Sequence, residues 1–257
     1  MAKYSKDLLI ISNRHISDEY FVIKLQAGQE VESILPGQFV QVRVDNANST
    51  FLRRPISVYD IDIKDHTIDL LIKVVGEGTE LLSKQKSGER LGIIYPLGNS
   101  FSLPRKGQRV LLVGGGVGVA PLFMAGKWLN NNGIDIEFLL GYRSAGQLID
   151  TDSFSSLGKL SITTEDGSYG EKGLVINHSR LKKENFDRIY CCGPDPMMKA
   201  VARLASGWKI HCEVSLENLM ACGIGVCLCC IEPTVNGNLC ACTDGPVFNI
   251  KDLKWQI

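Results

Sequence analysis

The sequence predicts an antiparallel β-barrel, then an α/β domain with a parallel sheet, then a small cysteine-rich module. Three observations support this order. Short β-rich runs follow one another up to about residue 102, and strands alternate with helices after about residue 104. Six of the nine cysteines lie between Cys222 and Cys242. We therefore expect domains at 1–103, 104–214 and 215–257.

The barrel is predicted from regularly spaced strands that are separated by turn residues. The expected strands are 8–11, 20–25, 38–44, 67–75 and 91–95. A short helix is expected at 79–84, after Gly76-Glu77-Gly78.

The α/β domain begins after Pro104-Arg105-Lys106-Gly107. Buried strands are expected at 109–113, 134–140 and 188–192, with helices at 121–131 and 195–206. Alternation of this kind implies parallel strands joined by crossover helices, and hence a Rossmann-like sheet.

The charge balance excludes several classes of partner. Lys and Arg together number 28, as do Asp and Glu, and neither sign forms a long block. We therefore expect no nucleic-acid partner and no membrane-surface partner. The longest apolar stretch, 110–125, is interrupted by glycines and by Pro121, so no membrane span is expected. An odd number of clustered cysteines favours metal or redox use in the reducing cytoplasm.

The cysteine spacing predicts an iron-sulfur site. Cys222, Cys227 and Cys230 form a C-x4-C-x2-C run, and Cys242 follows after eleven residues. Plant-type [2Fe-2S] ferredoxins use the same opening and one more distant Cys. Structural zinc bound by four thiolates is the alternative. Cys229 and Cys240 lie in the same stretch and could replace a neighbouring ligand.

Two glycine-containing turns predict a dinucleotide site. In each turn a strand runs into a helix, whose N-terminus favours a phosphate. Both turns follow strands of one parallel sheet and could face one crevice. A tight turn without a ligand is the alternative, and Cys192 could simply be a small buried thiol. The candidate residues are Gly114, Gly115, Gly116, Gly118, Pro121, Gly193 and Pro194.

A second phosphate site is predicted on the barrel. Arg54 stands at a strand entry, and its planar guanidinium can donate two hydrogen bonds to a phosphate. A solvated pair of arginines, Arg53 and Arg54, is the alternative. The other candidates are Pro55, Ile56, Ser57, Leu71, Ile72, Lys73, Gly78 and Thr79.

Together these motifs resemble those of the ferredoxin-reductase-like flavoproteins over essentially the whole chain. Arg54-Pro55-Ile56-Ser57 looks like the R-x-Y-[ST] flavin motif of that family, with Ile56 in place of the tyrosine. The resemblance implies that the barrel residues named above bind FAD. It also implies that the two turns bind a pyridine nucleotide, with Cys192 near the contact between nicotinamide and flavin.

The C-terminal segments 213–230 and 242–248 are similar to those of electron-transfer subunits of NAD-dependent dihydroorotate dehydrogenases. This similarity implies a [2Fe-2S] cluster on Cys222, Cys227, Cys230 and Cys242. It also implies a role in pyrimidine biosynthesis, NAD as acceptor and an FMN-containing catalytic subunit as partner, in a heterotetramer with two of each chain. A reductase subunit for ferredoxin or sulfur and a zinc-stabilised binding protein are the alternatives. Arg143 leaves the choice between NAD and NADP open, because it could meet a 2′-phosphate.

Overall fold

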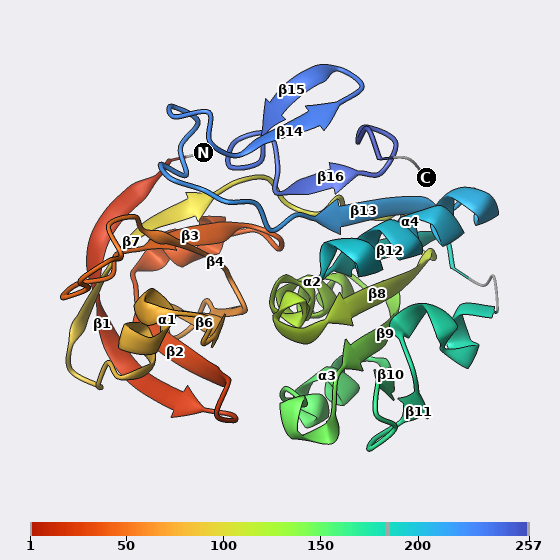
Figure 1. Cartoon of the computed structure of the whole chain (residues 1–257), viewed down its shortest axis with the longest axis horizontal. Helices are drawn as coiled ribbons and strands as arrows, with labels where there is room; N and C mark the ends of the chain where they lie inside the picture. Colours follow the sequence, from red (N-terminus) through yellow and green to blue (C-terminus); the bar gives the residue numbers. More distant parts are fainter. Residues whose placement is uncertain (1, 183–185, 256–257) are drawn as a thin grey trace.

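The computed structural model describes residues 2–182 and 186–255. Two sheets lie side by side, and the C-terminal segment runs along one edge of both (Figure 1). This segment carries a hairpin and the cysteine loop, a name used here for residues 222–230 and 240–245. The described helices are all too short or too polar to cross a lipid bilayer.

The first sheet is antiparallel and curls into the predicted barrel. The 3-10 helix η1 (Gln29–Ser33) and helix α1 (Glu77–Ser83) flank it. In spatial order its strands are β4 (Arg54–Ser57), β3 (Phe39–Val42), β7 (Arg90–Leu97), β1 (Tyr4–His15), β2 (Tyr20–Gln26), β6 (Thr67–Lys73) and β5 (Asp60–Asp62).

The second sheet is parallel apart from its last strand. In spatial order its strands are β11 (Glu171–Lys172), β10 (Lys159–Thr164), β9 (Asp135–Tyr142), β8 (Arg109–Gly115), β12 (Arg188–Cys192), β13 (His211–Ser215) and β16 (Val247–Asn249). The helices are α2 (Ala120–Asn131), α3 (Thr151–Leu157), α4 (Asp195–Trp208) and the 3-10 helices η2 (Gly116–Val119), η3 (Ala145–Gln147), η4 (Val175–Asn177) and η5 (Ser179–Lys182).

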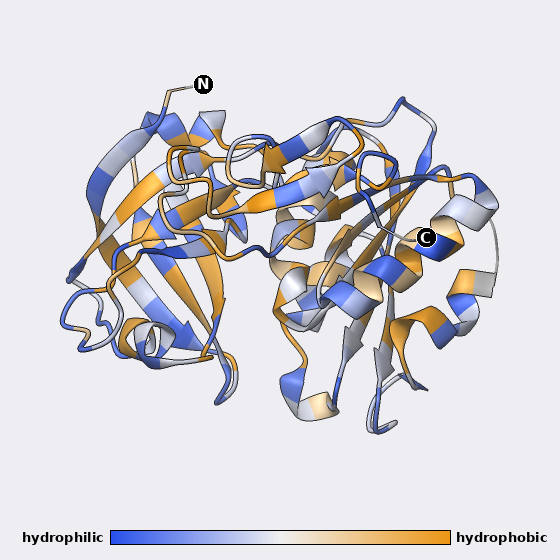
Figure 2. Ribbon diagram, turned by 45° about the horizontal axis from the view of Figure 1, so that its top comes forward, coloured by the Kyte–Doolittle hydropathy of each residue, from blue (hydrophilic) through white to orange (hydrophobic). Residues whose placement is uncertain are grey.

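Apolar faces of the second sheet are covered on both sides, as expected for a parallel sheet. Residues of α2 and α3 pack on the face that carries Val110 and Leu112, while residues of α4 pack on the face that carries Leu111 and Val113. Apolar residues dominate the buried strands (Figure 2). The α2 face also packs against Tyr20 of the barrel, so the two sheets share a core.

The cysteine-rich segment is anchored to both sheets. Hairpin strands β14 (Ile231–Thr234) and β15 (Gly237–Cys240) pair with each other, and β16 pairs with β13 of the parallel sheet. On the barrel side, Asn99 donates from its backbone to the Gly245 carbonyl at 2.6 Å and from its side chain to the Asp244 carbonyl at 2.8 Å. Both contacts fix the cysteine loop relative to the barrel.

The predicted fold class is confirmed, with differences in detail. The strand predicted at 38–44 is shorter, and the helix predicted at 79–84 begins at Glu77. Strand β10 and helix α3 were not predicted, because each segment holds only two apolar residues among polar ones. The β14–β15 hairpin was not predicted either, because cysteines and glycines obscure a strand pattern.

Candidate functional site

A pocket of about 370 Å³, here called the barrel pocket, is lined by most of the barrel candidates. They come from α1 and from β4 and β6, which lie near opposite ends of the sheet and are brought together by its curl. The lining candidates are Arg54, Pro55, Ile56 and Ser57 on β4, Leu71, Ile72 and Lys73 on β6, and Thr79 on α1. The opposite wall comes from the segment 216–220 and from Pro246, both of which adjoin the cysteine loop.

The two neighbouring arginines have different roles. Arg53 donates from Nη1 to the Gly92 carbonyl at 2.9 Å, and burial lowers its pKa. The side chain of Arg54 is half-buried and has no hydrogen-bond or ion-pair partner within residues 2–182 and 186–255. A cation held in a pocket without a counter-charge is suited to an anionic ligand.

The turn before α1 is held in shape next to Arg54. Gly78 packs directly against the Arg54 guanidinium. Thr79 Oγ1 accepts hydrogen bonds from the N–H groups of Val75 at 2.8 Å and Gly76 at 3.2 Å. The carboxylate of Glu77 binds Ser49 and the backbone of Asn48, which lowers its pKa to about 2.

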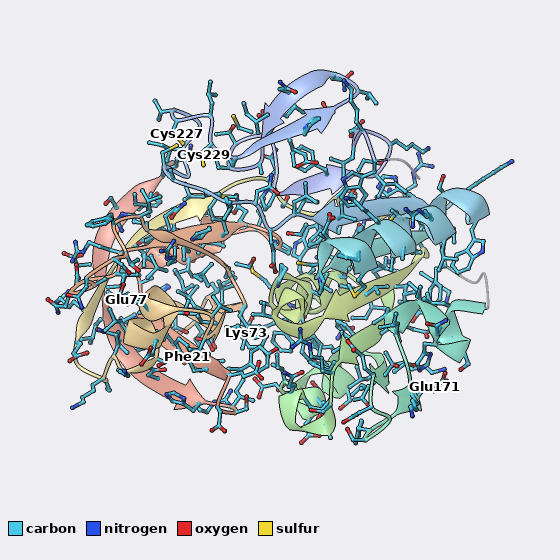
Figure 3. All side chains as sticks on the ribbon, in the orientation of Figure 1. Phe21, Lys73, Glu77, Glu171, Cys227 and Cys229 are labelled. Atoms are coloured by element: carbon cyan, nitrogen blue, oxygen red, sulfur yellow. The ribbon has the colours of Figure 1, made fainter. Side chains whose placement is uncertain are left out.

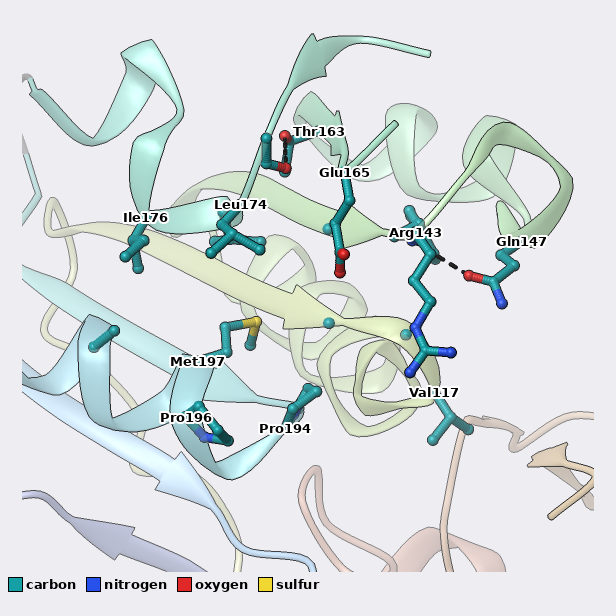
Figure 4. A pocket seen from close by; sticks show the side chains of 18 of the residues that line it. Val117, Arg143, Gln147, Thr163, Glu165, Leu174, Ile176, Pro194, Pro196 and Met197 are labelled. Atoms are coloured by element: carbon teal, nitrogen blue, oxygen red, sulfur yellow. Dashed lines mark hydrogen bonds between the residues drawn. The ribbon is translucent and has the colours of Figure 1, made fainter. Parts of the chain in front are cut away.

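A second pocket of about 360 Å³, here called the turn pocket, lies at the carboxyl ends of the parallel strands. It is lined by four of the predicted turn residues: Gly115, Gly116, Gly193 and Pro194. Figure 4 shows Arg143 and Glu165 beside this pocket, with the Arg143 N–H donating to Gln147 Oε1 at 3.3 Å. Glu165 was not among the sequence candidates, because β10, the strand before it, was not predicted.

The remaining turn candidates pack rather than line the pocket. Gly114 sits against Val119 and Leu140, and Pro121 is buried in the first turn of α2. A Cβ atom on Gly118 would lie 2.6 Å from the Cys192 carbonyl oxygen, so this glycine lets the two turns touch. Gly118 thus brings the two turns together, and the predicted contact of these three residues with a dinucleotide stays a prediction.

Cys192 is buried at the end of β12, between the two turns. Burial raises the pKa of its thiol well above the ordinary value, so the thiol is neutral. Among the described residues, its neighbour Gly193 lines the turn pocket, whereas Cys192 itself lines neither pocket. Its predicted place near the nicotinamide stays a prediction.

The two pockets adjoin each other. Lys73, Val117 and Glu217 line both of them. Lys73 is held by an ion pair with Glu19 at 3.1 Å. Glu217 is exposed and lines both pockets. The protein around its carboxyl group still desolvates it, and this desolvation raises its pKa. Ligands in the two pockets would therefore meet at these three residues.

The cysteine loop presents its thiols as pairs. The thiols of Cys222 and Cys227 interact, as do those of Cys230 and Cys242. A [2Fe-2S] cluster held by four cysteines has two iron atoms, each of which takes two thiolates. The four predicted ligands therefore interact within one segment, and their role as cluster ligands stays a prediction.

Backbone N–H groups surround the sulfur atoms. Cys222 Sγ accepts from Ile224 and Val226 at 3.4 Å each, and Cys230 Sγ accepts from Cys242 at 3.4 Å. Desolvation alone would raise the pKa of Cys222, but these donors and Cys227 lower it to about 6. These donors thus stabilise the thiolate of Cys222, which is the form that binds iron, whereas burial and the neighbouring Cys230 raise the pKa of the Cys242 thiol to about 12.

The other two cysteines of the loop differ from each other. Cys229 is exposed beside Cys227, and its thiol donates to the Leu219 carbonyl at 3.8 Å (Figure 3). The Cys240 thiol interacts with that of Cys230, so Cys240 stays within reach of the cluster site. Within the described residues, no group of three or more His, Cys, Asp or Glu side chains is arranged to hold a single metal ion.

The residues present fit the three groups that the sequence implies. The unpartnered Arg54 suits the diphosphate of FAD, and the paired, N–H-supported thiols suit a [2Fe-2S] cluster. At the carboxyl ends of the parallel strands, the glycine turns have no side chains that would keep a phosphate from the backbone N–H groups. This arrangement suits a dinucleotide.

Comparisons with known proteins match this arrangement. Residues 7–101 match a model for the oxidoreductase FAD-binding domain, and residues 217–254 match the iron-sulfur cluster binding domain of dihydroorotate dehydrogenase B. An NADH-dependent reduced ferredoxin-NADP oxidoreductase structure superposes with a TM-score of 0.87 at 32% identity, covering 96% of this chain and 90% of that chain. The cytochrome b5 reductase domain of Ulva prolifera nitrate reductase shares the fold at 16% identity and a TM-score of 0.68, covering 80% of this chain and 94% of that domain.

Two curated relatives cover nearly the whole chain. The dihydroorotate dehydrogenase B (NAD(+)) electron transfer subunit of Shouchella clausii is 36% identical over 98% of this chain and 99% of that protein. The subunit of the same name from Clostridium acetobutylicum is 39% identical over 93% of each. This chain therefore belongs to the family of dihydroorotate dehydrogenase B electron transfer subunits.

Proposed function

We propose that this chain carries electrons from an FMN-containing catalytic subunit, which oxidises dihydroorotate, to NAD+ in pyrimidine biosynthesis. The names of the curated relatives support the substrate and the acceptor. The single observation that carries the proposal is the continuity of three sites. The turn pocket and the barrel pocket share lining residues, and one wall of the barrel pocket is formed by residues 216–220, which lead directly into the cysteine loop.

The three bound groups supply complementary chemistry, because an iron-sulfur cluster carries single electrons, a flavin handles one or two, and nicotinamide accepts a hydride. The chain holds and orients these groups. Arg54 binds the phosphates in the barrel pocket, and Gly115 and Gly193 let a dinucleotide approach the backbone. Lys73, Val117 and Glu217 set how the two ligands face each other.

The cysteine loop lies close to the barrel pocket. Met220 lines that pocket, and Cys222 follows two residues later. Two residues of extended chain span at most about 7 Å. This short separation supports a relay between the first thiol of the loop and a flavin in the barrel pocket.

The partner and the setting are also part of the proposal. The term electron transfer subunit in the relatives' names supports a separate catalytic chain. We propose a heterotetramer with two copies of each chain, located in the cytoplasm. The free cysteines of the described chain support a reducing compartment, because exposed thiols oxidise elsewhere.

The test is to co-express this chain with the FMN-containing catalytic subunit from the same genome and to assay the purified complex. We expect bound FAD, iron and acid-labile sulfide, the last two in amounts equal to each other and twice that of FAD, and dihydroorotate-dependent reduction of NAD+. A complex with all three cofactors but no transfer from dihydroorotate to NAD+ would contradict the proposal.

A ferredoxin-linked reductase is the second candidate, because the NADH-dependent ferredoxin-NADP oxidoreductase structure is also similar over most of the chain. Assays of the same purified complex distinguish the two functions. Reduction of ferredoxin by NADH or NADPH at a rate above that of dihydroorotate-dependent NAD+ reduction would favour this second candidate.

A further inference from the structure

Gln41 is a buried polar residue that the predicted sites leave unexplained. It lies on β3 with none of its surface exposed. Both its Nε2 and its Oε1 are buried without a hydrogen-bond partner, and in the described part of the chain no other side-chain amide has both of its polar atoms in this state. Burying an amide without partners is costly, so such a group calls for an explanation.

The alternation of β3 shows where Gln41 points. Side chains along a strand alternate between its two faces. Val40 and Val42 belong to the core inside the barrel, whereas Phe39 packs with Met220, Cys230 and Cys242. Gln41 shares the outer face with Phe39, so its amide points away from the barrel interior and toward the cysteine loop.

A direct contact places the amide against that loop. Gly223 follows Cys222 and has a φ of +70°. A Cβ atom on Gly223 would lie 2.5 Å from Gln41 Cγ and 2.7 Å from Gln41 Nε2. The glycine therefore leaves room for the amide, and no other residue type fits there without moving Gln41.

Gln41 also lies next to the predicted flavin motif on β4. Its register partner across the sheet is Pro55, in the middle of the predicted flavin motif on β4. Its backbone carbonyl accepts a hydrogen bond from Arg53 Nη1 at 3.4 Å. The side chain thus stands between the strand that lines the barrel pocket and the loop that carries Cys222.

We propose that Gln41 is a positioning residue for the iron-sulfur cluster, whose Nε2 donates a hydrogen bond to a cluster sulfur on the side of Cys222. Thiolate and sulfide sulfurs accept hydrogen bonds and carry negative charge, so they complete the partnership that the amide lacks. The proposal rests on the proposed function insofar as the chain must hold the cluster.

A donor at this place has a defined electrochemical effect. Reduction adds negative charge to the cluster, and a hydrogen bond to sulfur stabilises the more negative state. Gln41 therefore raises the reduction potential of the cluster. It also holds the loop against β3, which slows the loss of iron.

The test compares Gln41→Met, which keeps the length of the side chain and removes its amide, with the wild-type holoprotein. We expect the equilibrium constant for cluster reduction to fall about tenfold, which is about 59 mV for one electron. Cluster absorbance is expected to decay several-fold faster under a chelator. Gln41→Leu also removes the donor from this buried position, and we expect it to lower the potential by about the same amount.

The outcomes separate the inference from the proposed function. If the Gln41 amide has only a packing role, both variants should leave the reduction potential and the rate of iron loss unchanged. That result, with iron and sulfide content equal to wild type, would overturn the role of Gln41 alone. Wild-type protein that binds no iron would instead overturn the iron-sulfur relay itself.

Discussion

The barrel pocket and the turn pocket are similar in size but are built in different ways. Strands β4 and β6 supply the barrel pocket with side chains, among them the cation of Arg54. In the turn pocket, the turns at Gly115 and Gly193 meet at the ends of parallel strands, and charged side chains such as Arg143 and Glu165 complete the lining. The first pocket is thus defined by side chains, whereas the second depends also on how closely two turns approach each other.

This difference predicts how each pocket responds to mutation. Removing one charge should weaken ligand binding in the barrel pocket without altering the fold. Adding one methyl group should disturb the turns by forcing backbone apart. The cysteine loop differs from both pockets, because its thiols are the predicted ligands of the iron atoms.

The largest effect is expected in the cysteine loop. Cys222→Ser should abolish electron transfer to the catalytic partner, because one iron loses a thiolate, while NADH still reduces bound FAD. Iron content, visible absorbance and NADH-dependent flavin bleaching measure both parts. Cys229→Ser is the matched control and should keep the cluster, since its thiol donates to a backbone carbonyl. Equal losses in the two variants would contradict the assignment.

The second effect tests the barrel pocket. Arg54→Gln should weaken FAD binding by about 10–100-fold, because a hydrogen bond to a charged group contributes about 1.5–3 kcal/mol. Equilibrium titration of the FAD-free protein measures this change. Arg90→Gln removes an exposed guanidinium from β7 and should leave FAD affinity as it is. An Arg54 variant that binds FAD as tightly as wild type would contradict the claim that this side chain determines ligand binding in the barrel pocket.

The third effect tests the turn pocket. Gly118→Ala should destabilise the fold by about 1–3 kcal/mol, because its Cβ would collide with the Cys192 carbonyl and the backbone of Gly193. Urea unfolding measures this loss. Gly207→Ala is the control, since it lies near the exposed end of α4 with open space around it. This control should gain about 0.5–1 kcal/mol.

The smallest effect concerns the choice of nucleotide. Glu165 lines the turn pocket and would repel a 2′-phosphate. Glu165→Gln should raise the ratio of NADP(H) to NAD(H) affinity about tenfold, or about 1.4 kcal/mol. Binding titrations with both nucleotides measure this ratio, and Asp152→Asn on α3 serves as the surface control. An unchanged ratio would point to Arg143 as the residue that sets the preference.

The sequence predicted the sites best where chemistry is encoded locally. The C-x4-C-x2-C run and the segment Arg54-Pro55-Ile56-Ser57 lie in single loops or strands, and the structure brings each group together. Glu165 and Gln41 were not found, because their roles depend on which strands lie side by side. The close packing around Gly114 and Gly118 was also out of reach, since a glycine that packs and a glycine that contacts a ligand look alike in a sequence.

The central claim is that the flavin stands between the nicotinamide and the cluster. It is tested by removing FAD while retaining the cluster, adding NADH without oxygen, and recording the electron paramagnetic resonance signal of the reduced cluster. The account predicts no signal until FAD is restored, and then a full one. A reduced cluster in the FAD-free protein would contradict it.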